Sequence, residues 1–206
     1  MSSIVSSIVS FTAPLRFPSF PSALYPPGRA HPGIRVVPEI DLPSHVASWG
    51  GAYPHIVLNC NRHAAHDADV FKARDKDTLD PTLDQTYQVI GWVLDDVVDY
   101  FPDNYLHLGG DEVDLRCFNA DVMARARHKH GAGTSKRQLL QMFWDRVIQM
   151  VVDRKKIPIV WQGTFDSRVH LPVQVVVQSW KCWGNPLLGV SHVQYFPSFY
   201  QYFWPI

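Results

Sequence analysis

From residue 33 onward, short apolar runs of strand length alternate with longer segments that carry a helical apolar period. The strand-length runs are GIRVVPEID at 33–41, NYLHL at 104–108, IPIVW at 157–161 and VQVVVQSW at 173–180. Such runs are typical of strands buried on both faces, and the first is expected to end at Pro38. With helices between them, the strands predict an α/β fold with right-handed crossovers, either a doubly wound parallel sheet or a barrel of eight βα units.

The helical period is clearest over 81–101, where apolar residues recur at steps of three and four. Asp80 is predicted to be the N-cap of this helix and Pro81 its first residue. Two further helices are predicted over 119–130 and 136–153. A loop is expected to begin near Gly163, after the third strand-length run.

The two ends of the chain differ from this pattern. Residues 1–32 are expected to be irregular, because their prolines fix φ and remove amide donors. The tail at 184–206 crowds aromatic residues without a helical period, so no element is predicted for it. A chain of 206 residues suits one core, and we expect a single domain between these ends.

Polar and aromatic residues follow the predicted strands at their carboxyl ends, where a barrel gathers its active site. They are Glu39, Asp41, Asp111, Glu112, Gln162, Asp166 and Trp180. Asp111 and Glu112 stand out because they are adjacent and follow two glycines. Two acids there suit the first turn of a helix, where the dipole favours negative charge, and they also suit catalysis. The spacing alone leaves both interpretations open.

Composition narrows the class of ligand. The 19 basic and 19 acidic side chains cancel, so no overall field favours a nucleic acid or an anionic membrane as partner. A neutral or weakly charged ligand is expected, and the 7 Trp, 8 Tyr and 11 Phe include rings of the kind that line sugar pockets. No apolar run reaches the roughly 18 residues of a membrane-spanning helix, and the first residues lack the basic segment of a secretory signal.

A metal site is a minor alternative. The stretch HAAHDAD at 63–69 offers ligand types in His63, His66, Asp67 and Asp69, but no second cluster accompanies it. Polar stretches of this composition are more typical of solvated loops. The sequence also lacks a G-x-S-x-G elbow, a G-x-G-x-x-G fingerprint and a P-loop.

Five segments occur in an order that suggests a family. They are GIRVVPEIDLPSHVASWG at 33–50, LDPTLDQTY at 79–87, HLGGDEVD at 107–114, VWQ at 160–162 and QSWK at 178–181. Together they resemble the β-N-acetylhexosaminidases of glycoside hydrolase family 20. The resemblance covers about residues 33–183 and implies a partial (β/α)8 TIM barrel, cut at both ends, with about four of eight βα units recognisable.

The resemblance also implies a reaction, namely hydrolysis of terminal non-reducing N-acetyl-β-D-hexosamine residues with retention. The substrate's own acetamido group would attack and form an oxazolinium intermediate, which suits adjacent acids better than an ordinary pair about 5 Å apart. Glu112, expected to be buried, would be the acid/base and Asp111 would support the acetamido group. His45 would bond near the acid/base, and Trp161 and Trp180 would line the sugar pocket.

Further expectations come from the same resemblance. Cys60 and Cys117 would form a disulfide and Cys182 would be the odd thiol, which implies an oxidising route and a lysosomal or secreted location. The ligand would be a glycan with a terminal N-acetylhexosamine, with no cofactor and no metal. The complete family member would be a homodimer or a heterodimer.

The chain also departs from the family pattern. The family usually has Glu where this chain has Gly163, and its late Trp-Tyr-Leu motif has no clear match in the tail. Early barrel strands that carry a sugar-binding Arg and an Asp partner for the histidine are absent. A truncated non-catalytic fragment or pseudoenzyme of the same family is therefore the alternative.

Overall fold

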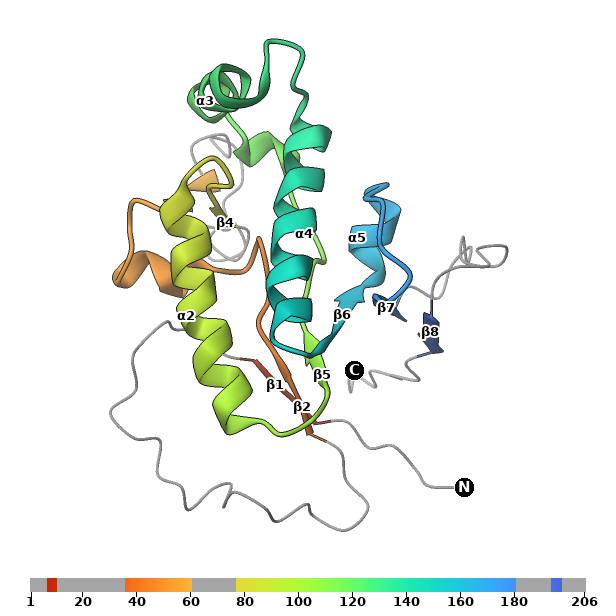
Figure 1. Cartoon of the computed structure of the whole chain (residues 1–206). Helices are drawn as coiled ribbons and strands as arrows, with labels where there is room; N and C mark the ends of the chain where they lie inside the picture. Colours follow the sequence, from red (N-terminus) through yellow and green to blue (C-terminus); the bar gives the residue numbers. More distant parts are fainter. Residues whose placement is uncertain (1–6, 11–35, 61–76, 181–193, 198–206) are drawn as a thin grey trace, which may run out of the picture.

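The computed structural model describes residues 7–10, 36–60, 77–180 and 194–197, which contain one open sheet of six parallel strands. The strand order is β1-β2-β5-β6-β7-β8, and every neighbouring pair is parallel. The strands are β1 (Ser7–Ser10), β2 (Val36–Glu39), β5 (Tyr105–His107), β6 (Ile157–Trp161), β7 (Val176–Ser179) and β8 (Gln194–Pro197) (Figure 1). The predicted α/β class is confirmed, and no closed barrel forms within the described ranges.

Two strands of the sheet were not predicted. β1 lies in the segment 1–32 that was expected to be irregular, and β8 lies in the tail that received no element. Both are edge strands that pair with a predicted strand. Neither lies in a continuous apolar run, because serines interrupt the residues around β1 and polar residues and prolines interrupt those around β8. The expectation that Pro38 ends its strand is also wrong, because β2 continues to Glu39. Pro38 pairs with Val9 of β1, and the register of β2 with β5 is at Glu39, so the missing amide of Pro38 does not interrupt the pairing with β5.

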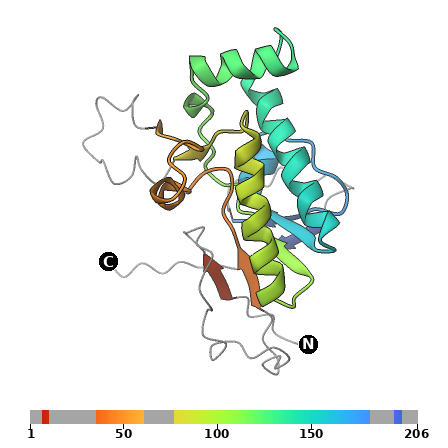
Figure 2. The same ribbon diagram turned by 60° about the vertical axis from the view of Figure 1, so that its left-hand side comes forward.

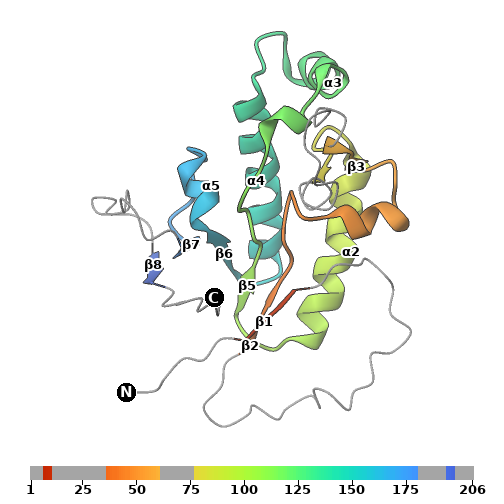
Figure 3. The same cartoon turned by 180° about the vertical axis from the view of Figure 1, so that it is seen from behind.

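The helices α2 (Asp84–Tyr100) and α4 (Lys136–Asp153) lie side by side along the sheet (Figures 1 and 3). Their apolar stripes and the buried faces of β5 and β6 form one core. Its members include Ile90, Leu94, Leu106, Leu108, Phe143, Val147 and Val160. This core fixes β5 and β6, and with them the loops at their carboxyl ends.

The helix α3 (Ala120–His130) lies across the end of α4 in Figure 2. Both α3 and α4 confirm the predicted helices. The side chain of Asn119 caps α3 by accepting hydrogen bonds from two backbone amides. Ser135 and Gln138 form a capping box at the start of α4. These caps are local sequence signals, which is why the starts of the two helices were predictable.

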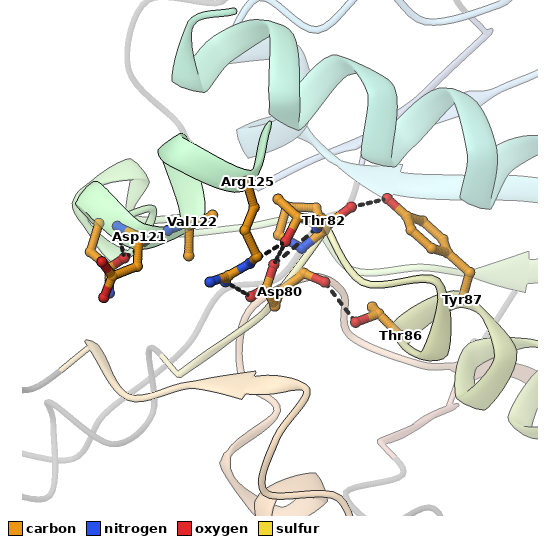
Figure 4. Close-up of polar contacts among 9 residues, drawn as sticks. Asp80, Thr82, Thr86, Tyr87, Asp121, Val122 and Arg125 are labelled. Atoms are coloured by element: carbon orange, nitrogen blue, oxygen red, sulfur yellow. Dashed lines mark hydrogen bonds and ion pairs between the residues drawn. The ribbon is translucent and has the colours of Figure 1, made fainter. Parts of the chain in front are cut away.

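The start of α2 was predicted wrongly, because the helix begins at Asp84 rather than at Pro81. Asp80 does not cap it. Its side chain accepts hydrogen bonds from the amide and the hydroxyl of Thr82, at 2.9 and 2.6 Å, and pairs with Arg125 of α3 (Figure 4). A carboxylate engaged in this way cannot also bond the first amides of the helix.

We call the charged contacts between these helices the α2–α3 corner. Its members are Asp80, Asp84, Arg125, Lys129 and Arg146. Asp80 is only 2% exposed and has Arg125 as its partner. Asp84 lies 3.0 Å from Lys129 Nζ and 3.1 Å from an Arg146 guanidinium nitrogen. Each acid of the corner therefore has a cationic partner.

Short elements complete the described part of the chain. They are the 3-10 helices η1 (Ala47–Gly51) and η3 (Leu115–Cys117), the antiparallel pair β3 (Val57–Leu58) and β4 (Thr78–Leu79), and helix α5 (Gln162–Asp166). The prediction of a loop from Gly163 is wrong, since α5 follows β6 directly. Five residues give no helical period that a sequence could show.

Two sequence features lie outside the described residues. They are the histidine-rich stretch at 63–69 and Cys182. Within the described residues, we find no helix with the length and apolar character needed to span a membrane.

Candidate active site

The loop after β2 carries His45 to the carboxyl edge of the sheet. The loop is anchored on one side by Leu42, whose amide donates to the Leu108 carbonyl at 3.0 Å. On the other side the buried hydroxyls of Ser44 and Thr78 bond at 2.9 Å. His45 itself has a φ of 60°, a left-handed conformation that is uncommon for a residue with a side chain. These anchors hold the imidazole at the edge of the sheet.

Two glycines turn the chain sharply after β5. Gly109 has a φ of 67°, and a Cβ on it would lie 1.9 Å from Oδ1 of Asp41. Gly110 has a φ of 98°, and a Cβ on it would lie 2.0 Å from Oγ1 of Thr164 and 2.8 Å from the Trp144 ring. Neither position has room for a side chain, so the glycines allow this loop to pack against α4 and α5.

Asp111 and Glu112 follow this turn and lie outside the strand, so the alternation of side chains along β5 does not separate them. His45 Nε2 lies 3.7 Å from Asp111 Oδ2 and 4.0 Å from Glu112 Oε2. Both distances exceed a hydrogen bond, but both acids approach the same imidazole. The interpretation of the acids as a helix start is wrong, because residues 111–114 are not helical. The expectation that Glu112 is buried is also wrong, since its side chain is 49% exposed.

Asp41 connects the loop after β2 to these acids. Its Oδ1 accepts the Gly110 amide at 3.1 Å, and its side chain hydrogen-bonds that of Asp111. Burial raises the pKa of Asp41 well above its usual range, the negative charge of Asp111 raises it further, and the Gly110 bond opposes both. Asp41 is therefore protonated at neutral pH and supplies the proton of the bond to Asp111.

Glu39, His107 and Trp161 form a second group, which we call the Glu39 layer. Glu39 and His107 are register partners, and they are only 5% and 2% exposed. The Trp161 indole donates to Glu39 Oε1 at 2.8 Å, and its ring lies 4.5 Å from that of His107. Burial raises the pKa of Glu39 to about 7 against the opposing Trp161 bond, with a smaller increase from the Asp111 charge. Burial lowers the pKa of His107 to about 3, so this imidazole is neutral.

We call the four carboxyls of this region the acidic edge. They are Glu39, Asp41, Asp111 and Glu112. Within the ranges that the structure describes, the basic groups at ion-pair distance from them are two imidazoles, those of His45 and His107. The negative charge of Asp111 raises the pKa of both Glu39 and Asp41, and carboxyls with raised pKa values cluster at catalytic sites.

Three residues of the region have the donor types of a cation site. Asp41, His45 and Asp111 each bring one ligand atom within 4.8 Å of the others. A metal ligand must be deprotonated, whereas Asp41 holds a proton and bonds Asp111 with it. A cation bound at these three residues would therefore have to displace the proton of Asp41.

The two tryptophans predicted for a sugar pocket lie at the carboxyl ends of neighbouring strands. Trp161 is the last residue of β6 and pairs in register with Gln178 of β7. Trp180 follows the end of β7 and is 43% exposed. Trp161 is thus fixed within the Glu39 layer, while Trp180 presents a large aromatic surface to solvent.

The predicted disulfide is confirmed. Cys60, after β3, is bonded to Cys117 of η3, with 57 residues of sequence separation. Cys117 lies five positions after Glu112 along the chain. The bridge therefore ties the segment that follows the two acids to the part of the chain that follows β3.

Sequence reasoning did not assign three residues of the site, Glu39, Asp41 and His107. The two acids were recognised only as residues at the carboxyl end of a strand. Their register and their contacts with Asp111 and Trp161 depend on strand pairing, which the sequence does not display. His107 has the pattern of a buried strand residue and gave no polar signal.

Comparison with known proteins identifies related sequences. A family model described as glycosyl hydrolase family 20, catalytic domain, matches residues 29–191. The β-hexosaminidase subunit beta of Mus musculus is 33% identical over 151 residues, which is 72% of this chain and 27% of that protein. The corresponding subunit of Felis catus is 35% identical over 152 residues, which is 72% of this chain and 27% of that protein. The chain spans about a quarter of the length of these relatives.

Solved structures agree in fold. A chitobiase from Flavobacterium johnsoniae superposes with a TM-score of 0.57 at 28% identity, covering 72% of this chain and 22% of that one. A β-N-acetylhexosaminidase from Bacteroides fragilis superposes with a TM-score of 0.54 at 30% identity, covering 72% of this chain and 26% of that one. An exo-β-N-acetylglucosaminidase from Vibrio harveyi superposes with a TM-score of 0.59 at 22% identity, covering 72% of this chain and 23% of that one. At this identity the similarity is one of fold.

Proposed function

Since the chain belongs to the catalytic domain of glycosyl hydrolase family 20, we propose that it hydrolyses terminal non-reducing N-acetyl-β-D-hexosamine residues with retention of configuration. The observation that carries this proposal is the acidic edge, where Asp111 and Glu112 stand together beside His45 without a Lys or Arg partner in the described ranges. Adjacent acids suit a reaction in which the protein supplies no nucleophile, and family 20 is a recognised substrate-assisted exception among glycosidases.

In the proposed first step, the acetamido carbonyl oxygen of the substrate forms a bond to the anomeric carbon. The bond from that carbon to the leaving oxygen breaks, and Glu112 transfers its proton to the leaving oxygen. In the second step the oxygen of water forms a bond to the anomeric carbon, and Glu112 accepts a proton from that water. The bond from the anomeric carbon to the acetamido oxygen breaks, which restores the acetamido group. The half-exposed position of Glu112 supports both roles, because leaving group and water can reach it.

Asp111 is proposed to accept the acetamido N–H and to offset the positive charge that develops on the nitrogen. Its hydrogen bond with Asp41 supports this role, because a protonated neighbour holds the carboxylate without neutralising it by a cation. Asp41 is thus a positioning residue for Asp111.

His45, Trp161 and Trp180 receive the remaining roles in the proposal. The imidazole of His45 is close to both acids and is proposed to orient them. The two indoles are proposed to form apolar walls around the sugar ring and its acetamido methyl group. Their places at the ends of neighbouring strands support a shared pocket.

The test is turnover of chromogenic N-acetyl-β-D-glucosaminide and N-acetyl-β-D-galactosaminide. We expect Glu112→Gln to lower kcat by about 100-fold or more, since general acid–base catalysis contributes that much. Asp114→Asn is a matched control, because Asp114 lies in the same loop but pairs with Arg116, and it should keep at least half the activity. Retention of more than a tenth of the activity by Glu112→Gln contradicts the proposal. Sugar binding without turnover by the unmodified chain supports the non-catalytic alternative.

We also propose a lysosomal or secreted location and a dimeric complete protein. The Cys60–Cys117 bridge supports passage through an oxidising compartment. The matched relatives are named as subunits beta and alpha of β-hexosaminidase, which supports a homodimer or a heterodimer. Sedimentation of the full-length protein distinguishes these states from a monomer.

A further inference from the structure

The Glu39 layer contains buried polar groups that the proposed reaction does not use. Glu39 pairs in register with His107, and His107 pairs with Ile159 of β6. Trp161 lies two positions beyond Ile159, so it shares a face of the sheet with these residues. Three side chains from three neighbouring strands therefore meet on one face.

The protonation state of His107 follows from its contacts. The Gly109 amide donates to His107 Nδ1 at 3.0 Å, so Nδ1 carries a lone pair and the proton of the neutral ring is on Nε2. The 3.5 Å contact between Nδ1 and Glu39 Oε1 therefore joins two acceptors and is not an ion pair. Glu39 obtains no charge compensation from His107.

The Trp161 indole is the group that bonds Glu39 directly, at 2.8 Å from Nε1 to Oε1. The same indole packs against the His107 ring, with an angle of 54° between the planes. One contact fixes the direction of its N–H, and the other fixes the tilt of the ring. A half-buried indole held in this way has little freedom to rotate.

We propose that Glu39 is a positioning residue, which holds the Trp161 indole through its N–H and thereby sets how large an N-acyl group the site accepts. The effect on acyl groups rests on the proposed function, in which Trp161 is a wall of the acetamido pocket. The hydrogen bond itself does not depend on turnover. The two parts can therefore be tested separately.

The first experiment observes the indole N–H proton of Trp161 by NMR, assigned by its loss in Trp161→Phe. A carboxylate accepts more strongly than a carboxylic acid, so this resonance should move downfield as pH rises through about 7. In Glu39→Gln the amide oxygen still accepts, and the resonance should remain protected but stop responding in this range. In Glu39→Leu, where no acceptor remains, its hydrogen exchange should accelerate about tenfold or more.

Other titrating groups near Glu39 need controls. Within the described residues, the ionisable side chains that face Glu39 are His107, Asp41 and Asp111, from the neighbouring strand and loops. Asp41→Asn should leave the transition of the Trp161 resonance in place. The indole N–H of Trp92, which is exposed on α2, is an internal reference and should not respond. A Trp161 resonance that is the same in Glu39→Leu as in the unmodified chain overturns the proposal.

The second experiment compares kcat/KM for N-acetyl and N-propionyl glucosaminides. One methylene in an apolar pocket discriminates about 10-fold or more, so the preference for N-acetyl should fall about tenfold in Glu39→Leu. Glu39→Gln should keep the preference within about twofold, because its amide still accepts the indole N–H. A merely structural role would lower both values equally, and that result overturns the specificity part. If the unmodified chain turns over neither substrate, the proposed function fails and the NMR result alone decides the positioning role.

Discussion

The acidic edge and the α2–α3 corner both gather carboxyls, but they stabilise them in opposite ways. In the corner, buried Asp80 has Arg125 and exposed Asp84 has Lys129 and Arg146. At the acidic edge, the described partners are imidazoles, backbone amides, an indole and other carboxyls. The corner matches each charge with its opposite, whereas the edge restrains its charges with protons and neutral donors.

This difference separates acids that stabilise the fold from acids that we propose to act in the reaction. A buried carboxylate next to an Arg gains attraction that offsets part of its desolvation. Carboxyls that face one another lose stability, and such losses are retained where a site requires the charge. The corner therefore holds α3 against the chain, and the edge is the arrangement for which we propose a reaction.

The largest expected effect concerns the disulfide, which supports the edge from outside. Replacing Cys60 and Cys117 by Ser should lower the free energy of unfolding by about 4 kcal/mol, because the bridge closes a loop of 57 residues. Urea denaturation of this variant and of the control Cys182→Ser measures the loss. A loss below about 1 kcal/mol would show that the bridge contributes little to holding the edge.

The next effect compares the loss of stability on replacing a glycine of the acidic edge with the loss on replacing a glycine that follows α3. Gly110 at the edge and Gly131 after α3 both have positive φ, but a Cβ meets close neighbours only at Gly110. Gly110→Ala should therefore cost about 3 kcal/mol or more, from strain and overpacking together, and Gly131→Ala about 1 kcal/mol. Thermal unfolding of both variants checks the order. Equal losses would mean that the packing of the edge against Thr164 and Trp144 is not tight.

A smaller effect is expected from the corner itself. Asp80→Asn removes a buried charge that Arg125 and Thr82 both bind, and it should lower the free energy of unfolding by about 2 kcal/mol. The matched variant Asp84→Asn, at an exposed acid, should lower it by less. Denaturation at two salt concentrations distinguishes them further, because salt should reduce only the Asp84 effect. A larger loss at Asp84 contradicts the comparison.

A further effect concerns how stability changes with pH. The folded-state pKa of Asp41 is raised, so between about pH 4 and that value the folded chain keeps a proton that the unfolded chain has released. The free energy of unfolding should therefore fall with rising pH, by about 1.4 kcal/mol per pH unit for this proton. Asp41→Asn should remove that contribution between pH 5 and 8. An identical slope in both proteins means that Asp41 does not hold the extra proton.

Glu39 adds to that slope and His107 opposes it. Glu39, whose pKa is raised to about 7, also makes the free energy of unfolding fall as pH rises toward that value. His107, whose pKa is lowered to about 3, makes the free energy of unfolding rise with pH between about pH 3 and about pH 6.5. Both groups remain in Asp41→Asn, so the difference between the two slopes isolates Asp41.

Local signals made much of the fold predictable. The helices α3 and α4 begin directly after Asn119 and Ser135, whose caps act over three residues. β5 and β6 lie in apolar runs, each with a glycine two positions beyond the strand. The prediction of the start of α2 was wrong because the carboxylate of Asp80 bonds Arg125, which is 45 residues away in the sequence. The prediction missed the edge strands β1 and β8 because serines interrupt the apolar residues around β1, and polar residues and prolines interrupt the aromatic residues around β8.

The candidate site was predictable to a different extent. Asp111, Glu112 and His45 stood in motifs that resemble a known family, and the structure brings them together. Asp41 and Glu39 lay in the same motif, but their importance comes from burial and from contacts across three strands. The exposure of Glu112 could not be anticipated, because it depends on how the two glycines redirect the chain.

The most direct test of this account compares Asp111→Asn with Asp80→Asn in one set of measurements, the free energy of unfolding at pH 7 and kcat/KM on a chromogenic N-acetylhexosaminide. We expect Asp111→Asn to be at least as stable as the unmodified chain, because it removes the charge that raises the pKa of Glu39 while its amide oxygen can still accept the proton of Asp41. We also expect it to lose about 100-fold or more in turnover. We expect the reverse for Asp80→Asn, with lower stability and unchanged turnover of the folded protein. An Asp111→Asn variant that is destabilised like Asp80→Asn and still active would contradict the account.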